Sequence, residues 1–345
     1  ILAANIGINP VSQGSFLRCP VPTLSGERRL ELAKKATQLA EEGKVRVRNA
    51  RRDVLEVLKK ANKEKLVTDD ELKRSEKDIQ TNTDKAIADI ENVVIVFKDG
   101  VGYDPAKLNA LSTPMLHALM AQFDSLAADP AVRVVVIRAA GKAFCAGHDL
   151  KEIQAARQSA DAGAAAFGDL FALCARVMQQ IAALPKPVIA QVQGIATAAG
   201  CQLVASCDMA VAETATRFGV NGVNIGLFCS TPAVALTRNV PAKPAFEMLV
   251  TGEFISAQTA ENWGLINHAV PADQLDSAID TLAATIAGKS PDAIRRGKAL
   301  FYAQREVHRA EAYTLAAEVM AQNMMDDNTA EGIDAFLEKR APVWR

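Results

Sequence analysis

PKPVIAQVQGIATAAGCQLVASCDMAVA, residues 185–212, decides the fold, because it carries a strand, a turn, a helix and a second strand in one short run. Residues 186–194 are mostly apolar and rich in Val and Ile, which is typical of a strand buried on both faces. A second run of this kind, VRVVVIRAA at 132–140, is followed by GKAFCAGHDL and another helical segment. Strand, tight turn and helix in repetition predict an α/β layer with ligands at the carboxyl ends of its strands.

Two of these turns have similar composition and together predict one binding site. In FCAGHDL (144–150), Gly147 precedes a helix start, so the backbone N–H of His148 can point outward. In GIATAAGCQ (194–202), Ala198, Ala199 and Gly200 open another helix in the same way. Two such N–H groups that converge on one oxygen form an oxyanion hole, which stabilises a carbonyl that gains negative charge. Small-residue turns before helices also serve ordinary packing, so each turn alone is open to that second interpretation.

Composition excludes several classes of protein. The chain has 345 residues, of which 49% are apolar, so it can bury a sizeable core. A net charge of −1 argues against nucleic acid or a membrane as the partner of the whole chain, and no apolar run is long enough to span a bilayer. The six cysteines form no C-x-x-C pair, so we expect reduced thiols, no disulfide framework and no metal site.

The beginning of the chain follows a different pattern from the rest. After Ser25, a candidate helix N-cap, small apolar residues recur at every seventh place. Thr68 and Glu71 then form a T-x-x-E capping box that starts a second helix, so the sequence predicts a long antiparallel helical hairpin. The first helix carries KVRVRNARRD, whose cationic face suits either phosphate contact or simple solvation. The seventh-place residues are Ala33, Ala40, Val47, Val54 and Ala61.

Residues 93–345 resemble the crotonase (enoyl-CoA hydratase/isomerase) superfamily. Besides the stretch quoted first, KLNALS (107–112), AFCAGHDLKEI (143–153), RFGVNGVNIGLF (217–228) and AFLEKRAP (335–342) carry the resemblance. It implies the α/β spiral of the ClpP/crotonase fold, a C-terminal helical region, and a coenzyme A thioester as substrate with no separate cofactor. It also implies an enzyme of the lyase class, in fatty acid metabolism.

The resemblance assigns roles to single residues. The amides of His148 and Ala199 match those that polarise the thioester carbonyl in an oxyanion hole. The end of the chain matches the part that reaches the CoA of a neighbouring subunit, which implies a homotrimer or a hexamer and no membrane partner. The residues at substrate-binding positions are Ala143, Ala146, Gly147, Phe336 and Lys339.

Gln202 and Gly222 depart from the hydratase pattern. Hydratases of this superfamily carry a glutamate at each of these positions. A glutamate can take or give a proton, whereas an amide does not titrate and glycine has no side chain. The sequence therefore predicts the fold and the oxyanion hole of the superfamily without robust hydratase activity.

Two other functions of this region stay open. His148 is titratable, and a decarboxylase of the superfamily carries Gly-His-Asp at this place, so one alternative is an acyl-CoA decarboxylase-like enzyme that stabilises an enolate. The other alternative is an acyl-CoA-binding protein without turnover, which the missing carboxylates favour. Cys145, Cys201 and Cys229 are expected to be buried small hydrophobic residues rather than nucleophiles.

Residues 1–92 resemble the C-terminal half of ribosome recycling factor, most specifically in VRNARRD. The resemblance implies that Arg48 and Arg51 contact ribosomal RNA, through residues 25–92 only, and a ribosome-associated factor is the third alternative. The first helix and most of the small β domain of that family are absent. The chain is thus predicted to comprise a partial recycling-factor-like segment, 1–92, and a crotonase-like domain, 93–345. Both resemblances fit a mitochondrial matrix or a bacterial cytoplasm.

Overall fold

The computed structural model describes residues 11–13, 16–18, 49–91, 93–96, 107–139 and 141–344. Its contacts divide the chain into two units, residues 1–43 and residues 44–345. The described part of the first unit is an antiparallel pair of short strands, β1 (Val11–Gln13) and β2 (Phe16–Arg18). The boundary predicted from the sequence, at 92/93, falls inside the second unit and stays a prediction.

Two helices form the predicted hairpin at the start of the second unit. One covers residues 49–63 and the other is α2 (Asp69–Glu91). An ion pair between Lys59 Nζ and Glu76 Oε1, at 3.9 Å, joins the two helices, as expected of neighbours in an antiparallel hairpin. The part of the predicted first helix before residue 49 lies outside the described residues.

The capping box lies where the sequence predicts it. Glu71 Oε2 accepts hydrogen bonds from the Thr68 amide at 2.9 Å and from the Thr68 hydroxyl at 2.8 Å. The Glu71 amide in turn donates to the Thr68 hydroxyl at 3.3 Å. This reciprocal pairing satisfies amides that the first turn of a helix leaves without partners, so it sets the start of α2.

A parallel sheet of five strands and a smaller sheet of three form the centre of the second unit. The large sheet has the order β10-β7-β5-β4-β3, and every neighbouring pair is parallel. In the small sheet β8 pairs parallel with β6 and antiparallel with β9. The strands of the large sheet are β3 (Val93–Val96), β4 (Val134–Arg138), β5 (Val188–Val192), β7 (Met209–Glu213) and β10 (His268–Val270). Those of the small sheet are β6 (Ile195–Thr197), β8 (Arg217–Gly219) and β9 (Ile255–Ser256).

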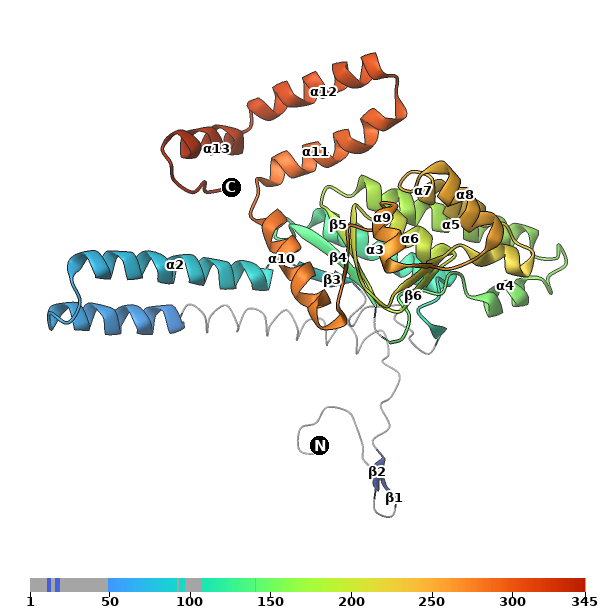
Figure 1. The fold of residues 1–345 in the computed structure, drawn as a ribbon, viewed down its shortest axis with the longest axis horizontal. Coiled ribbons are helices and arrows are strands. Elements are labelled where there is room, and N and C mark those ends of the chain that lie inside the picture. Colours follow the sequence, from blue (N-terminus) through green and yellow to red (C-terminus); the bar gives the residue numbers. More distant parts are fainter. Residues whose placement is uncertain are drawn as a thin grey trace. The chain divides into compact units, whose positions relative to one another are not determined.

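Helices cover both faces of the large sheet, which explains why its strands are mostly apolar (Figure 1). Successive side chains of a strand point to opposite faces. Val134 and Val136 of β4 belong to the cluster formed with α10, whereas Val135 and Ile137 belong to the larger cluster with α3, α5 and α6. The helices on these faces are α3 (Thr113–Ala128), α5 (Ala164–Ala183), α6 (Ala199–Ser206) and α10 (Leu275–Ala287).

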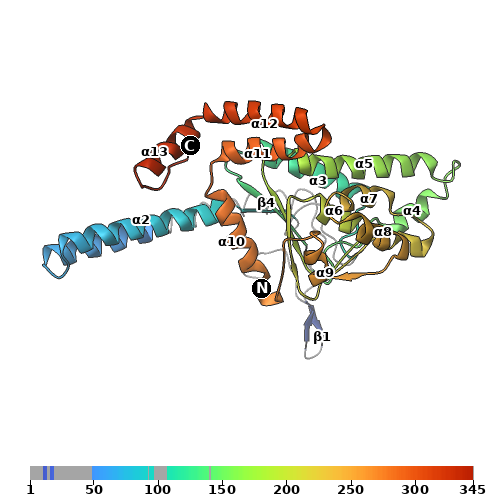
Figure 2. The same cartoon turned by 45° about the horizontal axis from the view of Figure 1, so that its top comes forward.

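Shorter helices connect these layers, and three more follow α10. In the connecting segments are α4 (Leu150–Ala156), α7 (Ser230–Leu236), α8 (Ala242–Thr251) and α9 (Ala257–Asn262), with 3-10 turns η3 (Asn221–Ile225) and η4 (Ala272–Gln274). The C-terminal helical region predicted from the sequence is α11 (Pro291–Ala303), η5 (Gln304–Glu306), α12 (Arg309–Met324) and α13 (Asp327–Leu337). α11 and α12 lie side by side in both views (Figure 2). No helix in the described ranges is both long and apolar enough to cross a membrane.

A buried lysine fastens α11 to the sheet. Lys298 Nζ donates to Asp208 Oδ2 at 2.7 Å and to the carbonyls of Ile181 and Lys186 at 2.8 and 2.9 Å. Tyr302 Oη donates to the other carboxylate oxygen of Asp208 at 2.7 Å. Burial lowers the pKa of Lys298, and the charge of Asp208 opposes that shift. The complete set of partners offsets the cost of burying both charges.

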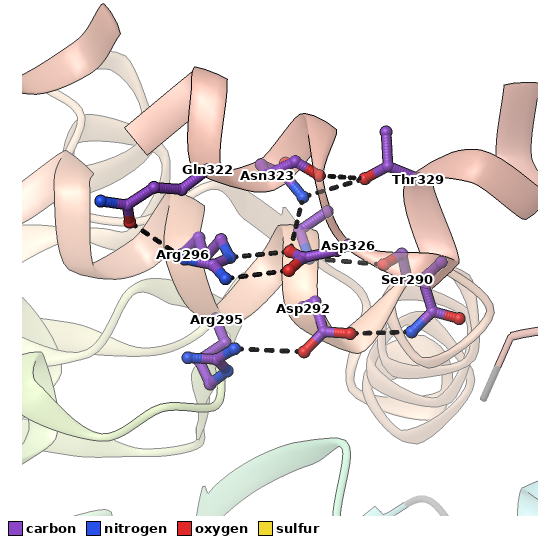
Figure 3. A network of polar contacts seen from close by, with 10 residues as sticks. Ser290, Asp292, Arg295, Arg296, Gln322, Asn323, Asp326 and Thr329 are labelled. Atoms are coloured by element: carbon purple, nitrogen blue, oxygen red, sulfur yellow. Dashed lines mark hydrogen bonds and ion pairs between the residues drawn. The ribbon is translucent and has the colours of Figure 1, made fainter. Parts of the chain in front are cut away.

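A second polar network holds α13 against α11 (Figure 3). Arg296 of α11 forms a two-point ion pair with Asp326, with N–O distances of 2.7 and 2.9 Å. Asn323 Nδ2 donates to Asp326 at 3.1 Å, and Asn328 Nδ2 donates to Asp292 at 2.8 Å. Paired geometry of this kind fixes orientation as well as distance, so the C-terminal helices form one ordered group.

Candidate active site

The first turn of the candidate site lies between β4 and α4. The amides of Phe144 and Cys145 donate to the Ile195 carbonyl at 2.9 and 3.2 Å, which fastens this segment to β6. Gly147 has a φ of 91°, a conformation that side chains disfavour. Asp149 caps α4, because its Oδ1 accepts from the amides of Lys151 and Glu152 at 2.9 and 3.4 Å.

The second turn lies between β6 and α6. Its central residue, Ala198, has φ 49° and ψ −120°, which is a strained conformation for a residue other than glycine. The Ala198 amide donates to the Gly219 carbonyl at 2.9 Å, so β8 helps to hold it there. Ala199 is the first residue of α6 and therefore has no acceptor within that helix.

Glycines allow the two turns to touch. A Cβ atom at residue 147 would lie 3.0 Å from the Cβ of Ala198 and 3.4 Å from the Ala199 nitrogen. A Cβ atom at residue 200 would lie only 2.2 Å from the Cys145 carbonyl oxygen. The turn of His148 and the turn of Ala199 are thus in direct contact, as the predicted oxyanion hole requires. Within the described residues, neither of these two amides donates a backbone hydrogen bond.

The imidazole of His148 has one partnered and one unpartnered nitrogen. Nδ1 lies 3.1 Å from the Leu111 carbonyl oxygen. Nε2 is buried and has no hydrogen-bond partner among the described residues. The ring meets Phe171 of α5 edge to face, with centroids 5.5 Å apart. Burial lowers the pKa of His148 below its ordinary 6.5, although the Leu111 carbonyl and the charge of Glu152 oppose the shift.

Gln202 of α6 is buried, and the oxygen of its side-chain amide has no partner among the described residues. The side chain is 4% exposed, and its Oε1 has no hydrogen-bond partner in the described structure. An unpaired buried acceptor costs about 1–3 kcal/mol, so such atoms are uncommon outside functional sites. The match of this position to a catalytic glutamate of the hydratases stays a prediction from the sequence.

Gly222 has no space for a side chain. A Cβ atom there would lie 2.3 Å from the Leu227 carbonyl oxygen and 2.8 Å from Cys229 Sγ. The Gly222 amide donates to that sulfur at 3.3 Å, and its carbonyl accepts from the Leu227 amide at 2.9 Å. The loop therefore closes on the glycine backbone, so a glutamate at this position would require the loop to move.

The cysteines near these turns are buried and free. Burial raises the pKa of the Cys145 and Cys201 thiols to about 12, and it also raises the pKa of Cys229. A thiol in this state is a poor nucleophile, because the thiolate is the reactive form. The expectation that these residues act as small hydrophobic groups agrees with their burial.

Glu152 is a feature of the site that sequence reasoning missed. Its carboxylate accepts from the Thr113 amide at 3.0 Å and from the Thr113 hydroxyl. It also lines a cavity of about 440 Å³ between α3, α4 and α5. The only signal in the sequence is its place three residues after the cap Asp149, and that spacing alone does not reveal a partner 39 residues away.

The other predicted substrate-binding residues lie in different places. Ala143 is buried, and its carbonyl accepts from Asn109 Nδ2 at 2.9 Å. Ala146 is partly buried in the first turn, and its amide donates to the Leu108 carbonyl at 3.1 Å. Phe336 is 83% exposed near the end of α13, and Lys339 follows with φ 56°. No contact in the described structure joins Ala143 and Ala146 to Phe336 and Lys339. The structure therefore does not bring these two pairs of predicted residues together.

The predicted RNA-contact residues are described only in part. Arg48 lies outside the described residues. Arg51 lies in the helix over 49–63, where it lines a groove of about 330 Å³ with Arg52 and Lys59. Among the residues that the structure covers, no group of three or more His, Cys, Asp or Glu side chains could hold a metal ion.

Comparisons with known proteins agree with this geometry. The enoyl-CoA hydratase/isomerase family matches residues 101–345, and the ribosome recycling factor family matches residues 1–98. Curated relatives called enoyl-CoA hydratase domain-containing protein 3, mitochondrial, include one from Xenopus laevis, 46% identical over 241 residues (70% of this chain, 80% of that protein). The protein of that name from Homo sapiens is 42% identical over 271 residues (79% and 86%).

Solved structures also match most of this chain. An enoyl-CoA hydratase from Mycobacterium smegmatis has a TM-score of 0.69 at 53% identity, covering 73% of this chain and 95% of that one. The human enoyl-CoA hydratase domain-containing protein 3 has a TM-score of 0.69 at 43% identity, covering 74% and 97%. The predicted crotonase-like fold is confirmed, and the chain belongs to the enoyl-CoA hydratase/isomerase family.

Proposed function

We propose that this protein binds acyl-CoA thioesters and stabilises the thioester enolate between the amides of His148 and Ala199. The observation that carries the proposal is the direct contact of the two turns, with both amides left without a backbone acceptor among the described residues. A thioester oxygen would satisfy both donors. The stabilisation is largest when that oxygen carries the charge of an enolate, because the donors are already oriented.

Hydration of an enoyl thioester is not the expected main reaction. The amide of Gln202 does not titrate and therefore cannot act as a general acid or base, and Gly222 leaves no space for a carboxylate. The relatives named as hydratases support an acyl-CoA substrate. Their names do not show that this chain has the acid and the base that hydration needs. Enolate formation with a different base and acyl-CoA binding without turnover are the two outcomes that this site supports.

A calorimetric titration tests the oxyanion hole directly. Butyryl-CoA and the thioether S-butyl-CoA differ in the carbonyl group, so their affinities report its contacts. Two hydrogen bonds at about 0.5–1.5 kcal/mol each predict at least about fivefold tighter binding of the thioester. Equal affinities would overturn the proposed hole, and no binding of either compound would overturn the proposed ligand class.

Product analysis separates the reactions. We expect little 3-hydroxybutyryl-CoA when the protein is incubated with crotonyl-CoA, because both candidate acid/base positions lack a titratable group. Rapid water addition would contradict this expectation. Loss of CO2 from malonyl-CoA or methylmalonyl-CoA that disappears in His148→Ala would instead support the decarboxylase alternative.

As a second function of this protein, we propose that residues 25–92 bind RNA. The supporting observation is the groove along the helix 49–63, where Arg51, Arg52 and Lys59 lie in the part matched by the recycling-factor family. Cationic side chains that neutralise phosphates give affinity that falls with salt.

The test uses the full chain and large-subunit ribosomal RNA at several salt concentrations. The double variant Arg48→Ala/Arg51→Ala should bind more weakly and with a smaller salt slope than the control Lys243→Ala/Arg305→Ala. Unchanged binding of the first variant would remove the assigned contacts.

We further propose a homotrimer or hexamer, in a mitochondrial matrix or a bacterial cytoplasm. Exposed apolar side chains on α13, among them Phe336 (83% exposed) and Leu337 (71% exposed), support an interface between copies. Light scattering of the purified chain tests the assembly, and Phe336→Ser should lower the measured mass if this surface forms it.

Of the two proposed locations, the mitochondrial matrix is supported by the word mitochondrial in the relatives' names.

A further inference from the structure

The surroundings of His148 determine which of its nitrogens carries the proton. Nδ1 faces the Leu111 carbonyl oxygen at 3.1 Å. A carbonyl oxygen only accepts hydrogen bonds, so in the neutral ring Nδ1 is the N–H donor. Nε2 then carries the lone pair, and it is buried without a partner among the described residues. The site thus contains one proton-accepting nitrogen that no contact in the described structure uses.

We propose that Nε2 of His148 is the proton acceptor of the site, and that Glu152 is a positioning residue that acts through His148. This inference rests on the proposed function, because it supplies the base that Gln202 and Gly222 do not. It also distinguishes two uses of His148: an acceptor removes a proton from the acyl group, whereas recognition of a substrate carboxylate would need a donor at Nε2.

Glu152 and His148 hold the same neighbouring segment. The His148 ring contacts the carbonyl of Leu111, while the Glu152 carboxylate accepts from the amide and hydroxyl of Thr113. The Leu111 amide also donates to the Gly147 carbonyl at 2.7 Å. The segment 111–113 is therefore fixed at both ends of the turn, which keeps the Leu111 carbonyl in place to orient the imidazole.

The other titratable groups nearby already have different roles. Asp149 caps α4 and forms an ion pair with Lys107, at 3.3 Å. Cys145 is buried with a pKa raised to about 12. The cavity beside Glu152 also has three charged or titratable side chains at its exposed rim, which are His117, Asp169 and Arg176.

The proposed step balances without a further reagent. His148 Nε2 takes a proton from the carbon next to the thioester carbonyl. The electron pair of that C–H bond forms the enolate double bond, and the carbonyl oxygen takes the negative charge beside the amides of His148 and Ala199. On the imidazolium, the Nε2 proton exchanges with D2O, and return of the deuteron from Nε2 to the same carbon restores the thioester with deuterium in place of hydrogen.

The experiment follows this exchange in the full chain with butyryl-CoA in D2O, by mass spectrometry or NMR. His148→Asn is the matched variant, because an asparagine can still donate to the Leu111 carbonyl but has no Nε2. We expect exchange to fall by about 10²- to 10⁴-fold in this variant, with butyryl-CoA binding retained through the backbone amide. His148→Ala serves as a second variant without any side-chain donor.

The pH profile tests both parts of the proposal. The imidazole must be neutral to accept a proton. The exchange rate should therefore be highest above the pKa of His148 and fall as the pH decreases through that pKa. The negative charge of Glu152 favours the imidazolium, so Glu152→Gln should move the midpoint to lower pH while the amide still accepts from Thr113. Glu247→Gln, an exposed change on α8, should leave the midpoint unchanged.

Each outcome has a distinct meaning. Absence of butyryl-CoA binding would overturn the proposed function itself. Binding without exchange in the unchanged protein, or exchange that persists in His148→Asn, would overturn the base. Exchange that decreases as pH rises would assign a donor role instead. An unchanged midpoint in Glu152→Gln would leave Glu152 a structural role only.

Discussion

The two turns that meet at the candidate site are held in different ways. In the turn at 143–149, side chains add to the backbone hydrogen bonds, since the ring of His148 faces the Leu111 carbonyl and Asp149 caps α4 and pairs with Lys107. The turn at 194–200 is fixed by backbone hydrogen bonds and close contact, with Ala198 strained and Gly200 against the Cys145 carbonyl. A single substitution can remove one side-chain contact and leave the others. A bulkier residue at a close backbone contact instead pushes the whole turn away from its neighbour.

Gly200→Ala should have the largest effect. Alanine in place of glycine normally stabilises a helix by about 1 kcal/mol, but here the new Cβ would lie 2.2 Å from the Cys145 carbonyl oxygen. Overpacking of this severity costs about 3 kcal/mol or more, so the clash should dominate. Denaturant unfolding measures the net change. A stability equal to the unchanged protein would show that the two turns can separate at little cost.

Restoring the hydratase carboxylates should disturb the closed loop rather than create a hydratase. Gly222→Glu should lower the free energy of unfolding by about 2–3 kcal/mol, because its Cβ would meet the Leu227 carbonyl. Gln202→Glu alone should give little crotonyl-CoA hydration, since the second acid is still missing. The two variants are compared by unfolding and by an absorbance assay. A large gain in hydration from Gln202→Glu would refute this expectation.

Asp149→Ala should have a moderate effect that depends on pH. Loss of the cap costs about 1 kcal/mol. Burial raises the pKa of Asp149, but hydrogen bonds from Lys151, Glu152 and Lys107 outweigh it, so the pKa lies below the ordinary 3.8. A lowered pKa stabilises the fold above the unfolded value, and this stabilisation is lost as pH falls through the folded value. Unfolding at pH 7 and pH 3 should therefore show a smaller difference between the two proteins at the lower pH.

Lys107→Met should have the smallest effect in this series. The Lys107 side chain is 57% exposed, and its ion pair with Asp149 is 3.3 Å long. Exposed pairs contribute about 0–1 kcal/mol, so we expect a change of less than about 0.5 kcal/mol at 0.15 M salt. Comparison with Asp149→Ala separates the cap from the ion pair. A loss as large as that of Asp149→Ala would mean that the pair, rather than the cap, fixes this turn.

Much of the fold could be predicted from local pattern. The apolar runs at 132–140 and 186–194 contain β4 and β5, and the small-residue turn opens α6 where expected. The capping box of α2 was likewise readable, because its partners are three residues apart. These features follow from alternation, turn composition and helix caps, which act over a few residues.

The chemistry of the site was less accessible from the sequence. The partner of Glu152 is 39 residues away and that of His148 is 37 residues away, so no local pattern reveals them. The lack of space at Gly222 depends on the path of the loop to Leu227, which composition does not fix. Sequence reasoning identified the residues that line the turns, but the contacts that orient them come from tertiary structure.

The order of the large sheet has a consequence for assembly during synthesis. Read from its edge, the order β3-β4-β5-β7-β10 is also the order along the chain. Each strand can therefore pair with the strand made just before it in that sheet, and none has to be inserted between two that are already paired. Domains form as the chain leaves the ribosome, at about 5–20 residues per second. A sheet with this order can grow at one edge throughout translation, because each new strand is added beside the strand that was placed last.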